Sequence, residues 1–358
     1  MAGGGTGGHV IPAVAVAREL KNRGHQPIFV GTRTGFEAKL VPSAGFPLEF
    51  IEIGGLKRVG AVQTLRTLTQ LPGSIARSFG LITRHRPSAI FSMGGYAAGP
   101  VTLAAWFNYV PIVIMEPNAV PGLANRIMGR FAARALVSFP ETQRFFPTGR
   151  SEITGLPVRC EFFNLGPKPE SDHLTILVTG GSRGSRTLNN ATRESWPHMR
   201  GAPFHVRLIH QTGTDAHEAI AKDFAGAGID GEVVPFISDM PSAFGQADLI
   251  VCRSGAGAVA ELAASGKPSI LVPFPFAADD HQLRNAEAFA KAGAARLVLD
   301  RELTGPRLYE EVSRLAANPA ELEQMGAKAR TFAHPNAAQR AAGVLEEITA
   351  GKGRPRNV

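Results

Sequence analysis

Two glycine-rich turns in this chain have the composition of an anion-binding loop. The first, Gly-Gly-Gly-Thr-Gly-Gly-His at residues 3–9, runs into a segment with helical spacing of apolar residues, Val10–Leu20. The second, Thr-Gly-Gly-Ser-Arg-Gly-Ser, occupies residues 179–185. Glycines let the backbone approach a ligand closely, and the free N–H groups and dipole of a helix N-terminus favour negative charge. Two such turns, about half a chain apart, suggest two halves that bind one charged ligand.

Polar side chains near these turns could do chemistry on such a ligand. His9 ends the first turn, and an imidazole can act as a general base near neutral pH; a capping or core role is the alternative. Glu116 and Asn118 follow an apolar strand-like run, where side chains of an α/β sheet usually face a ligand. The alternative for Glu116 is a structural acid that accepts from loop N–H groups. A third glycine cluster, residues 92–100 with Tyr96 inside it, fits either ligand binding or tight packing.

The second half of the chain holds the most specific pattern. Residues 252–261, Cys-Arg-Ser-Gly-Ala-Gly-Ala-Val-Ala-Glu, have the pattern of a strand end followed by a helix start of small side chains. Small residues leave room for a diphosphate at a helix N-terminus, and Glu261 can accept hydrogen bonds from ribose hydroxyls. Asp280 and Gln282 follow the next strand and can bind sugar hydroxyls. Each group alone could be a helix cap, but the two groups stand at successive strand ends.

Short β-rich runs alternate with helical runs along the whole chain, which predicts an α/β doubly wound architecture of parallel sheets. In the first half we expect strands at residues 27–30, 50–53, 89–92, 112–115 and 135–138. The pattern restarts with strands at residues 174–178, 205–210, 232–236, 249–252, 269–272 and 296–299. A chain of 358 residues is too long for one ordinary core, so two domains are expected.

A polar segment rich in Pro and Gly, residues 164–170, is expected to link the domains. The predicted organisation is an N-terminal domain at 1–163, a second domain at 164–335, a last helix at 336–350 and a basic tail at 351–358. A phosphate-binding turn should follow a strand, yet only Met1 and Ala2 precede Gly3. We therefore expect the first strand to be truncated and the chain as written to be poorly stable.

Positive charge is concentrated in the first half of the chain. Residues 1–165 contain 17 of the 38 Lys and Arg but only 8 of the 30 acidic residues, while the whole chain has a net charge of +8. A basic face attracts nucleic acid or an anionic membrane, and a solvated surface is the alternative. The lack of interleaved aromatic residues disfavours nucleic acid. Two cysteines give no disulfide framework, and no run reaches the ~18 apolar residues of a spanning helix.

Residues 73–85 have an amphipathic helical pattern. An apolar stripe ringed by arginines fits a contact with an anionic membrane, and a stripe that packs in the core is the alternative. The residues concerned are Ile75, Phe79 and Ile82 in the stripe, Leu81 on the opposite side between two arginines, and Trp106 and Phe107 as nearby candidates.

The motifs occur together in one known family. The set Gly-Gly-Thr-Gly-Gly-His, Gly-Gly-Tyr, Glu-x-Asn, Gly-Gly-Ser-x-Gly, Arg-Ser-Gly-Ala and Asp-x-His-Gln-x-x-Asn-Ala resembles the bacterial lipid II-forming N-acetylglucosaminyltransferases. The match runs in order over nearly the whole chain. It implies a GT-B fold, in which two Rossmann-like domains face a cleft and the last helix crosses back onto the first domain. Met115 and Pro117 depart from the family's frequent His-Glu-Gln-Asn, and Ser185 stands where alanine is common.

The resemblance also implies which residues bind the donor, UDP-N-acetylglucosamine. In the second domain the Ile237 backbone would contact uracil, Ser182 the phosphates and Gln282 the N-acetylglucosamine. The diphosphate and ribose segment is Ala256, Gly257, Ala258, Val259, Ala260 and Glu261. The donor contacts implied for the first domain are Thr6, Gly7, Gly8, Asn118 and Arg159. The positions associated with acceptor binding or activity are His9, Tyr96, Glu116 and Asn189.

The reaction implied is an inverting transfer of N-acetylglucosamine to the 4-hydroxyl of lipid I, undecaprenyl-diphospho-N-acetylmuramoyl-pentapeptide. The products are lipid II and UDP, in peptidoglycan biosynthesis. His9 or Glu116 would remove the hydroxyl proton, while the helix start at 256–258 and the 180–185 turn would stabilise the leaving diphosphate. No cofactor and no metal is expected, because the Asp-x-Asp pattern of metal-dependent sites is missing.

The same resemblance implies where the protein works and with what. The partners are the donor, the undecaprenyl-linked acceptor and an anionic membrane surface, with other cell-wall synthesis and division proteins also allowed. The implied localisation is the cytoplasmic face of the plasma (inner) membrane, to which the protein would attach peripherally.

Other enzyme classes share this architecture. One is the GT-B transferases that act on a diacylglycerol or a macrolide, and another is the UDP-sugar epimerases. An epimerase would need more acid and base groups around the anomeric carbon than His9 and Glu116. A dehydrogenase would place an acid at the end of the second strand to bind a ribose, where this chain has Gly31-Thr32-Arg33.

Overall fold

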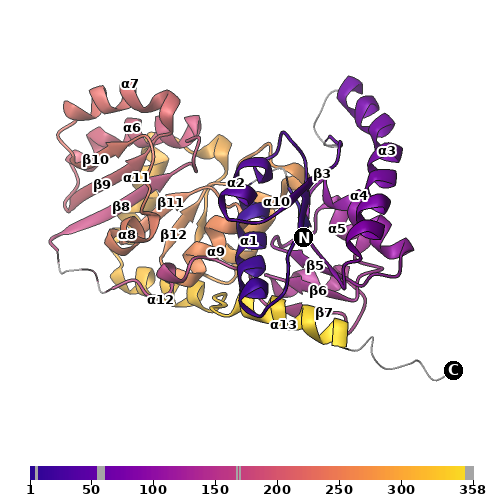
Figure 1. Cartoon of the computed structure of the whole chain (residues 1–358). Helices are drawn as coiled ribbons and strands as arrows, with labels where there is room; N and C mark the ends of the chain where they lie inside the picture. The colour runs from indigo at the N-terminus through magenta and orange to yellow at the C-terminus, as the bar shows by residue number, and fades with distance from the viewer. Residues whose placement is uncertain (5–6, 55–60, 167, 169–170, 351–358) are drawn as a thin grey trace. The chain divides into compact units, whose positions relative to one another are not determined.

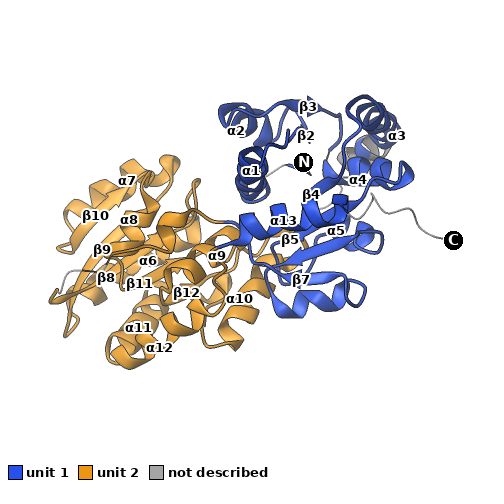
Figure 2. Ribbon diagram, turned by 60° about the horizontal axis from the view of Figure 1, so that its bottom comes forward, with its two compact units in different colours: residues 1–157, 336–358 blue, residues 158–335 orange. Residues whose placement is uncertain are grey.

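The computed structural model describes residues 1–4, 7–54, 61–166, 168 and 171–350 (Figure 1). The chain divides into two compact units, unit 1 with residues 1–157 and 336–358 and unit 2 with residues 158–335 (Figure 2). Each unit contains a parallel β-sheet whose successive strands are connected mainly through helices. The predicted α/β class with two Rossmann-like domains is therefore confirmed. The first change of unit falls at Pro157, a few residues before the predicted end at 163.

Unit 1 contains a seven-stranded sheet in the order β3-β2-β1-β4-β5-β6-β7. Its strands are β1 (Ala2–Gly3), β2 (Phe29–Gly31), β3 (Leu48–Phe50), β4 (Ile90–Gly94), β5 (Ile112–Glu116), β6 (Arg134–Val137) and β7 (Ser151–Ile153). Its helices are α1 (Gly7–Asn22), α2 (Glu37–Ser43), α3 (Ala61–His85), α4 (Ala98–Phe107), α5 (Leu123–Met128), a 3₁₀ helix (Pro140–Phe145) and α13 (Ala337–Ala350). Strands β4 and β5 are buried along their whole length, because helices cover the sheet and the strand residues are mostly apolar.

Strand β1, two residues long, stands where the sequence analysis expects a truncated first strand. Ala2 pairs with Val30 of β2 and Ser92 of β4, so β1 lies at the centre of the sheet. Met1 extends this pairing: its carbonyl accepts from the Val30 N–H at 2.9 Å, and its amino group donates to the Ile28 carbonyl at 2.8 Å. Burial lowers the pKa of the Met1 amine to about 5. Backbone pairing on both sides thus allows a strand of two residues to hold this place.

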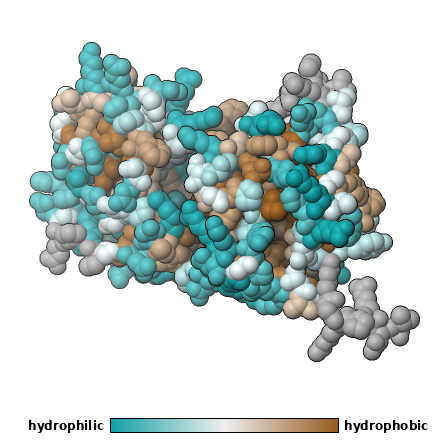
Figure 3. All heavy atoms as spheres, in the orientation of Figure 1, coloured by the Kyte–Doolittle hydropathy of each residue, from teal (hydrophilic) through white to brown (hydrophobic). Residues whose placement is uncertain are grey.

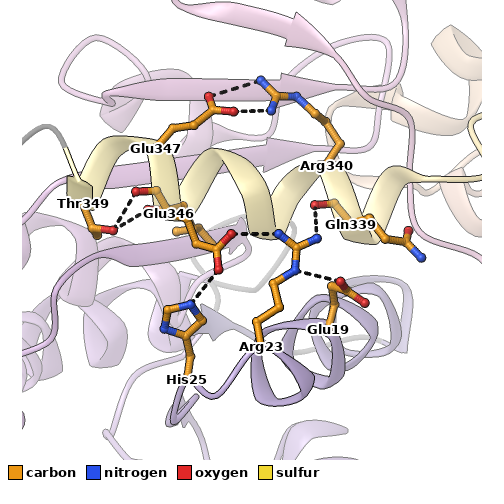
Figure 4. A network of polar contacts seen from close by, with 9 residues as sticks. Glu19, Arg23, His25, Gln339, Arg340, Glu346, Glu347 and Thr349 are labelled. Carbon is orange, nitrogen blue, oxygen red and sulfur yellow. Dashed lines mark hydrogen bonds and ion pairs between the residues drawn. The ribbon is translucent and has the colours of Figure 1, made fainter.

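The last helix, α13, belongs to unit 1 and contacts α1 (Figure 4). Its buried face includes Ala341 and Leu345, and polar contacts surround that face. Arg23, just after α1, bonds to Glu346 at 2.8 Å and to the Gln339 carbonyl at 3.1 Å. Because exposed ion pairs contribute only about 0–1 kcal/mol each, the apolar face supplies most of the attachment.

Unit 2 contains a six-stranded sheet in the order β10-β9-β8-β11-β12-β13. Its strands are β8 (His173–Thr179), β9 (His205–Gln211), β10 (Asp230–Val234), β11 (Leu249–Cys252), β12 (Ser269–Leu271) and β13 (Arg296–Leu297). Its helices are α6 (Arg186–Arg200), α7 (Thr214–Ala225), α8 (Met240–Gln246), α9 (Ala256–Ser265), α10 (His281–Lys291), α11 (Gly305–Ala316) and α12 (Pro319–Arg330), with 3₁₀ helices at Cys160–Phe162, Ala278–Asp280 and Asp300–Glu302.

Every strand predicted from the sequence overlaps an observed strand, with ends that differ by a few residues. The sequence pattern misses β7, which lies at the edge of the unit 1 sheet. Three residues with a glutamate at the centre give no recognisable alternation of apolar and polar positions. Apolar periodicity therefore locates the buried strands and fails at a short strand on the sheet edge.

Candidate functional site

A cavity of about 970 Å³ opens at the carboxyl ends of the unit 2 strands. Its walls are the turn after β8, the start of α9, the loop after β12 and the start of α6. Ligands of open α/β sheets bind at this edge, and the volume is in the range of small-molecule sites. Residues that the sequence analysis placed at the donor and that line this cavity are Gly180, Ala258, Glu261 and Gln282.

The turn after β8 depends on two glycines for its shape. Gly181 and Gly184 have φ angles of +86° and +72°, which side-chain-bearing residues rarely adopt. A Cβ on Gly184 would lie 1.8 Å from the Thr212 carbonyl oxygen. Ser185 ends the turn and caps α6, because its hydroxyl accepts from the Leu188 N–H at 3.3 Å. Ser182 is exposed on the turn, as a residue that meets a phosphate would be.

The start of α9 provides a second anion-binding feature in the same cavity. Gly255 precedes the helix, and no side chain caps its first N–H groups. These groups can therefore bind a phosphate oxygen. Gln282 lies beside them: its side-chain oxygen accepts from the Phe274 N–H at 3.0 Å, and its amide nitrogen is directed toward Gly255. Of residues 256–260, Ala258 lines the cavity, and its small side chain leaves room there.

Glu261 faces the cavity from the second turn of α9. Burial raises the pKa of its carboxyl to about 7, and the positive charge of Arg159 opposes this rise. Arg159 belongs to unit 2, not to the first domain as the sequence analysis expected, because the unit boundary precedes it. Arg159 is exposed and lies over the Phe162 ring at 5.1 Å.

Arg253 is a residue of this site to which the sequence analysis gave no role. Its guanidinium donates to the Ser185 hydroxyl at 2.6 Å, to the Val272 carbonyl at 3.1 Å and to the Asp300 carboxylate. Arg253 thus joins the end of the phosphate turn to two other strand ends. One sequence feature could have indicated Arg253, namely its position directly before the segment of small residues. Its partners could not be predicted, because they are distant in the sequence.

Two further predicted residues of unit 2 have defined partners. The Ile237 N–H donates to the Gln211 side-chain oxygen at 2.8 Å. Asn189 lies in α6 with only 3% of its surface exposed; its amide donates to the Thr212 carbonyl at 2.9 Å and contacts His210. Burial and these two partners favour a structural role for Asn189 in unit 2, and its expected contact with an acceptor stays a prediction.

In unit 1 the carboxyl edge of the sheet carries two glycine turns in contact. Gly94 ends β4 and Gly95 follows it, both with φ angles near +80°, and a Cβ on Gly95 would lie 2.7 Å from the Gly4 carbonyl oxygen. The same added atom would lie 3.6 Å from Nδ1 of His9, so His9 stands at the junction of the two turns. Gly7, Gly8 and His9 form the first turn of α1, whereas Thr6 lies outside the described residues.

Tyr96 and an unpredicted carboxylate complete this edge of unit 1. The Tyr96 hydroxyl lies 3.4 Å from the Thr32 hydroxyl, and Thr32 also bonds through its hydroxyl to Glu37 at 2.9 Å. Glu37 is fully buried, and a Cβ added to Gly4 would lie 2.4 Å from its carboxylate. The residues directly after β2, Thr32 and Arg33, include no acid. Glu37 comes six residues after the end of β2 and reaches back from the start of α2.

Glu116 is a structural acid, which corrects its prediction as a catalytic base. Only 1% of its surface is exposed. One carboxylate oxygen accepts from the backbone and side chain of Asn118, each at 3.0 Å, and the other from Gly122 N–H at 3.1 Å and Asn125 at 2.9 Å. Burial raises the pKa of Glu116, and these four donors oppose the rise. The carboxylate is committed to holding the loop after β5, so His9 remains the base candidate.

The amphipathic pattern of α3 is mainly a core pattern. Leu81 and Ile82 are both buried in the unit 1 core, although the helical pattern puts Leu81 on the side opposite the stripe that contains Ile82. Trp106 and Phe107 at the end of α4 are 40% and 55% exposed, and Phe131 packs against Trp106 at 4.7 Å. Figure 3 shows hydrophobic side chains on the unit 1 surface beside hydrophilic ones. The exposed arginines within five residues of Phe131 in the chain are Arg126, Arg130 and Arg134.

The described residues contain neither a metal-binding cluster nor a membrane-spanning helix. Among these residues no three His, Cys, Asp or Glu side chains are grouped so that they could hold a metal ion. No helix in the same part of the chain has both the length and the apolar character needed to span a bilayer.

Family models and curated relatives match nearly all of this chain. The Glycosyltransferase family 28 N-terminal domain matches residues 1–137, and the C-terminal domain matches residues 175–341. A relative from Solibacter usitatus is 60% identical over 97% of this chain and 95% of its own length. One from Myxococcus xanthus is 40% identical over 97% and 92%. Both relatives are named UDP-N-acetylglucosamine–N-acetylmuramyl-(pentapeptide) pyrophosphoryl-undecaprenol N-acetylglucosamine transferase.

One solved structure agrees with these relatives, and another shares only the fold. The crystal structure of Acinetobacter baumannii MurG has a TM-score of 0.81 and 33% identity, and the match covers 96% of this chain and 97% of that one. The UDP-GlcNAc 2-epimerase from Neisseria meningitidis has a TM-score of 0.65 over 96% and 98% of the two chains, but at 14% identity it shows the fold alone. With two family models that together span most of its length and a relative at 60% identity, this chain belongs to glycosyltransferase family 28 and is a glycosyltransferase.

Proposed function

We propose that this enzyme transfers N-acetylglucosamine from UDP-N-acetylglucosamine to the 4-hydroxyl of undecaprenyl-diphospho-N-acetylmuramoyl-pentapeptide, giving lipid II and UDP. The observation that carries the proposal is the unit 2 cavity, where a glycine turn, an uncapped helix start and Glu261 meet. These are groups for a diphosphate and a ribose. The relatives named for this reaction match the chain over 97% of its length.

Donor binding is assigned to unit 2. The diphosphate meets the N–H groups at the start of α9 and the Gly180–Ser185 turn, both of which stabilise the charge that develops on the leaving UDP. Glu261 accepts from the ribose hydroxyls, Gln282 contacts the N-acetylglucosamine, and the Ile237 backbone contacts the uracil. Gly7, Gly8 and Asn118 of unit 1, together with Arg159, complete the donor contacts.

Proton removal is assigned to His9. A neutral imidazole accepts the proton of the acceptor hydroxyl as the oxygen attacks the anomeric carbon, and the carbon–oxygen bond to UDP breaks with inversion. Tyr96 shares the same edge of the unit 1 sheet and is assigned to the acceptor. General-base catalysis contributes about 10²–10⁴-fold to the rate. No step in this scheme uses a cofactor or a metal ion.

Attachment to the cytoplasmic face of the inner membrane is assigned to unit 1. The supporting observation is the exposed aromatic cluster, Trp106, Phe107 and Phe131, with exposed arginines within five residues of Phe131 in the chain. Aromatic side chains enter the headgroup region while arginines bind anionic lipid. This peripheral contact would bring unit 1 to its lipid-linked acceptor. Other cell-wall synthesis and division proteins are further partners within the proposal.

The test is a product analysis with UDP-N-acetylglucosamine and a short-chain analogue of the lipid acceptor. The proposal predicts a β-linked disaccharide on the lipid and one UDP for each transfer. Formation of the 2-epimer of the donor sugar would instead favour the epimerase class, which shares this fold. Transfer to a diacylglycerol or a macrolide, and not to the acceptor analogue, would favour another GT-B transferase.

A further inference from the structure

Gln211 joins two loops of unit 2 that the site otherwise leaves separate. It is the last residue of β9, and 1% of its surface is exposed. Its amide nitrogen donates to the Gly181 carbonyl at 2.8 Å and to the Thr179 hydroxyl at 3.1 Å, in the turn after β8. Its amide oxygen accepts from the Ile237 N–H at 2.8 Å, in the loop after β10. Both ends of one buried amide are therefore in use at once.

The orientation of this amide is determined by its partners. A backbone N–H can only donate and a carbonyl oxygen can only accept. The Ile237 N–H therefore requires the amide oxygen on its side, and the Gly181 carbonyl requires the nitrogen on the other. A flipped Gln211 amide would place its oxygen against the Gly181 carbonyl and its nitrogen against the Ile237 N–H. Only one orientation of the amide therefore makes both hydrogen bonds.

The backbone around Gln211 has little freedom to compensate for its loss. The Gly181 carbonyl also accepts from the Gly184 N–H at 2.9 Å, which closes the turn after β8. Thr212, the next residue after Gln211, donates from its N–H to the Val234 carbonyl at 3.0 Å. Gly184 packs so closely on the Thr212 carbonyl that no Cβ would fit. The turn after β8 and the loop after β10 are thus both attached to the end of β9 through Gln211 and Thr212.

We propose that Gln211 is a positioning residue for the donor, which fixes the spacing between the turn that binds the diphosphate and the loop that contacts the nucleobase. A single nucleoside diphosphate can then reach both with no rearrangement of either loop. Gln211 acts through Gly181 and Ile237 and does not touch the reacting atoms. The inference rests on the proposed donor site of unit 2.

The first test replaces the amide by a side chain of the same length with no hydrogen bonds, Gln211→Met. We expect the KM for UDP-N-acetylglucosamine to rise roughly tenfold or more, because a buried N–H and a buried carbonyl each lose a partner. The kcat should stay within about twofold. Gln246→Met is the matched control, since Gln246 lies at the end of α8 away from both loops and bonds to Arg207.

Binding measurements with two fragments of the donor, UDP and uridine, distinguish a positioning role of Gln211 from a general loss of fold stability. If Gln211 sets the spacing, Gln211→Met weakens UDP about tenfold but leaves the affinity for uridine nearly unchanged, because uridine alone does not have to span both loops. A parallel fall in uridine and UDP affinity, together with a lowered melting temperature, would show a purely structural role and overturn the inference.

A second variant, Gln211→Glu, gives a pH signature. A protonated carboxyl can donate to the Gly181 carbonyl and accept from the Ile237 N–H, whereas an ionised one places a negative oxygen against the carbonyl. Burial raises the pKa of such a carboxyl. We expect the donor KM of this variant to approach the wild-type value as the pH falls, with no such trend for Gln211→Met. A donor KM for Gln211→Glu that does not change with pH would overturn the proposed positioning role of Gln211.

Gly184→Ala distinguishes this inference from the donor site on which it rests. If Gly184→Ala and Gln211→Met both leave the donor KM unchanged, the donor site itself is misplaced. If Gly184→Ala raises the KM and Gln211→Met does not, the donor site stands and only the role of Gln211 is wrong.

Discussion

The two glycine-rich turns have similar sequences and equivalent places in their sheets, yet different parts of the structure support them. The turn after β8 follows a seven-residue strand and is held by side chains: Gln211 at Gly181 and Arg253 at Ser185. After the two-residue strand β1, the described Gly4 lies against the Gly95 turn and against the buried Glu37 carboxylate. The unit 2 turn thus has two polar side chains bonded to it, whereas Gly4 of unit 1 is enclosed by close packing.

The two units also differ in how the first N–H groups of several helices are capped. Side chains cap α6, α8, α11 and α12 of unit 2 through Ser185, Asp239, Thr304 and Asn318. In unit 1 the residues that precede α2, α4 and α5, Phe36, Ala97 and Gly122, make no side-chain cap. In unit 2 the uncapped start of α9 faces the cavity, so the missing cap there leaves N–H groups for the donor.

Loss of the base candidate of unit 1 should have the largest effect. His9→Ala is expected to lower kcat by about 10²–10⁴-fold, because no other group in the described part of unit 1 is assigned to take the acceptor proton. The donor KM should stay close to wild type. Steady-state kinetics with the lipid acceptor analogue measure both, and His25→Ala, at the surface contact with Glu346, is the control. A kcat near wild type for His9→Ala would remove the base assignment.

A methyl group in the unit 2 turn should have the next largest effect. Gly184→Ala forces a Cβ into the Thr212 carbonyl, so we expect at least a tenfold rise in the donor KM and a lower melting temperature. Gly181→Ala has the same positive φ but meets nothing within 4 Å, which makes it a matched control with a smaller effect. Equal effects of the two substitutions would show that strain, and not packing on Thr212, controls the turn.

The aromatic cluster allows a comparison of the two surfaces. Phe107→Ser in unit 1 should weaken binding to vesicles that contain anionic lipid roughly tenfold, because an inserted phenylalanine contributes about 1.5–3 kcal/mol. Phe236→Ser in unit 2 removes a side chain of similar exposure, 57% against 55%, and should have little effect. Co-sedimentation measures both variants. Equal losses for the two would show that the membrane contact is not confined to unit 1.

Glu261→Gln should have the smallest effect, on the pH dependence of stability. The folded protein holds the Glu261 proton up to a pKa of about 7, against an ordinary value of 4.5, so ionisation destabilises the fold as the pH rises between these values. Relative to wild type, the variant should gain on the order of 2–4 °C in melting temperature at pH 8 and less at pH 5. Glu218→Gln, at an exposed carboxyl of unit 2, is the control. A difference that is constant with pH would contradict the raised pKa.

The sequence predicts the fold and much of the donor site because both depend on local patterns. Apolar periodicity locates the strands, and the small residues before Glu261 already indicate space at a helix start. The sequence does not reveal the structural partners of Glu116 and Asn189, since only the folded chain brings four donors to the first and His210 and Thr212 to the second. It also misses Gln211, whose partners Gly181 and Ile237 are 30 and 26 residues away in the chain.

The central claim is a division of labour, in which the unit 2 turn binds the donor and His9 of unit 1 acts on the acceptor. Calorimetric titration of UDP-N-acetylglucosamine into His9→Ala and Gly184→Ala tests it most directly. The account predicts a Kd equal to wild type for His9→Ala and a Kd at least tenfold higher for Gly184→Ala. A weakened donor affinity in His9→Ala together with an unchanged affinity in Gly184→Ala would contradict it.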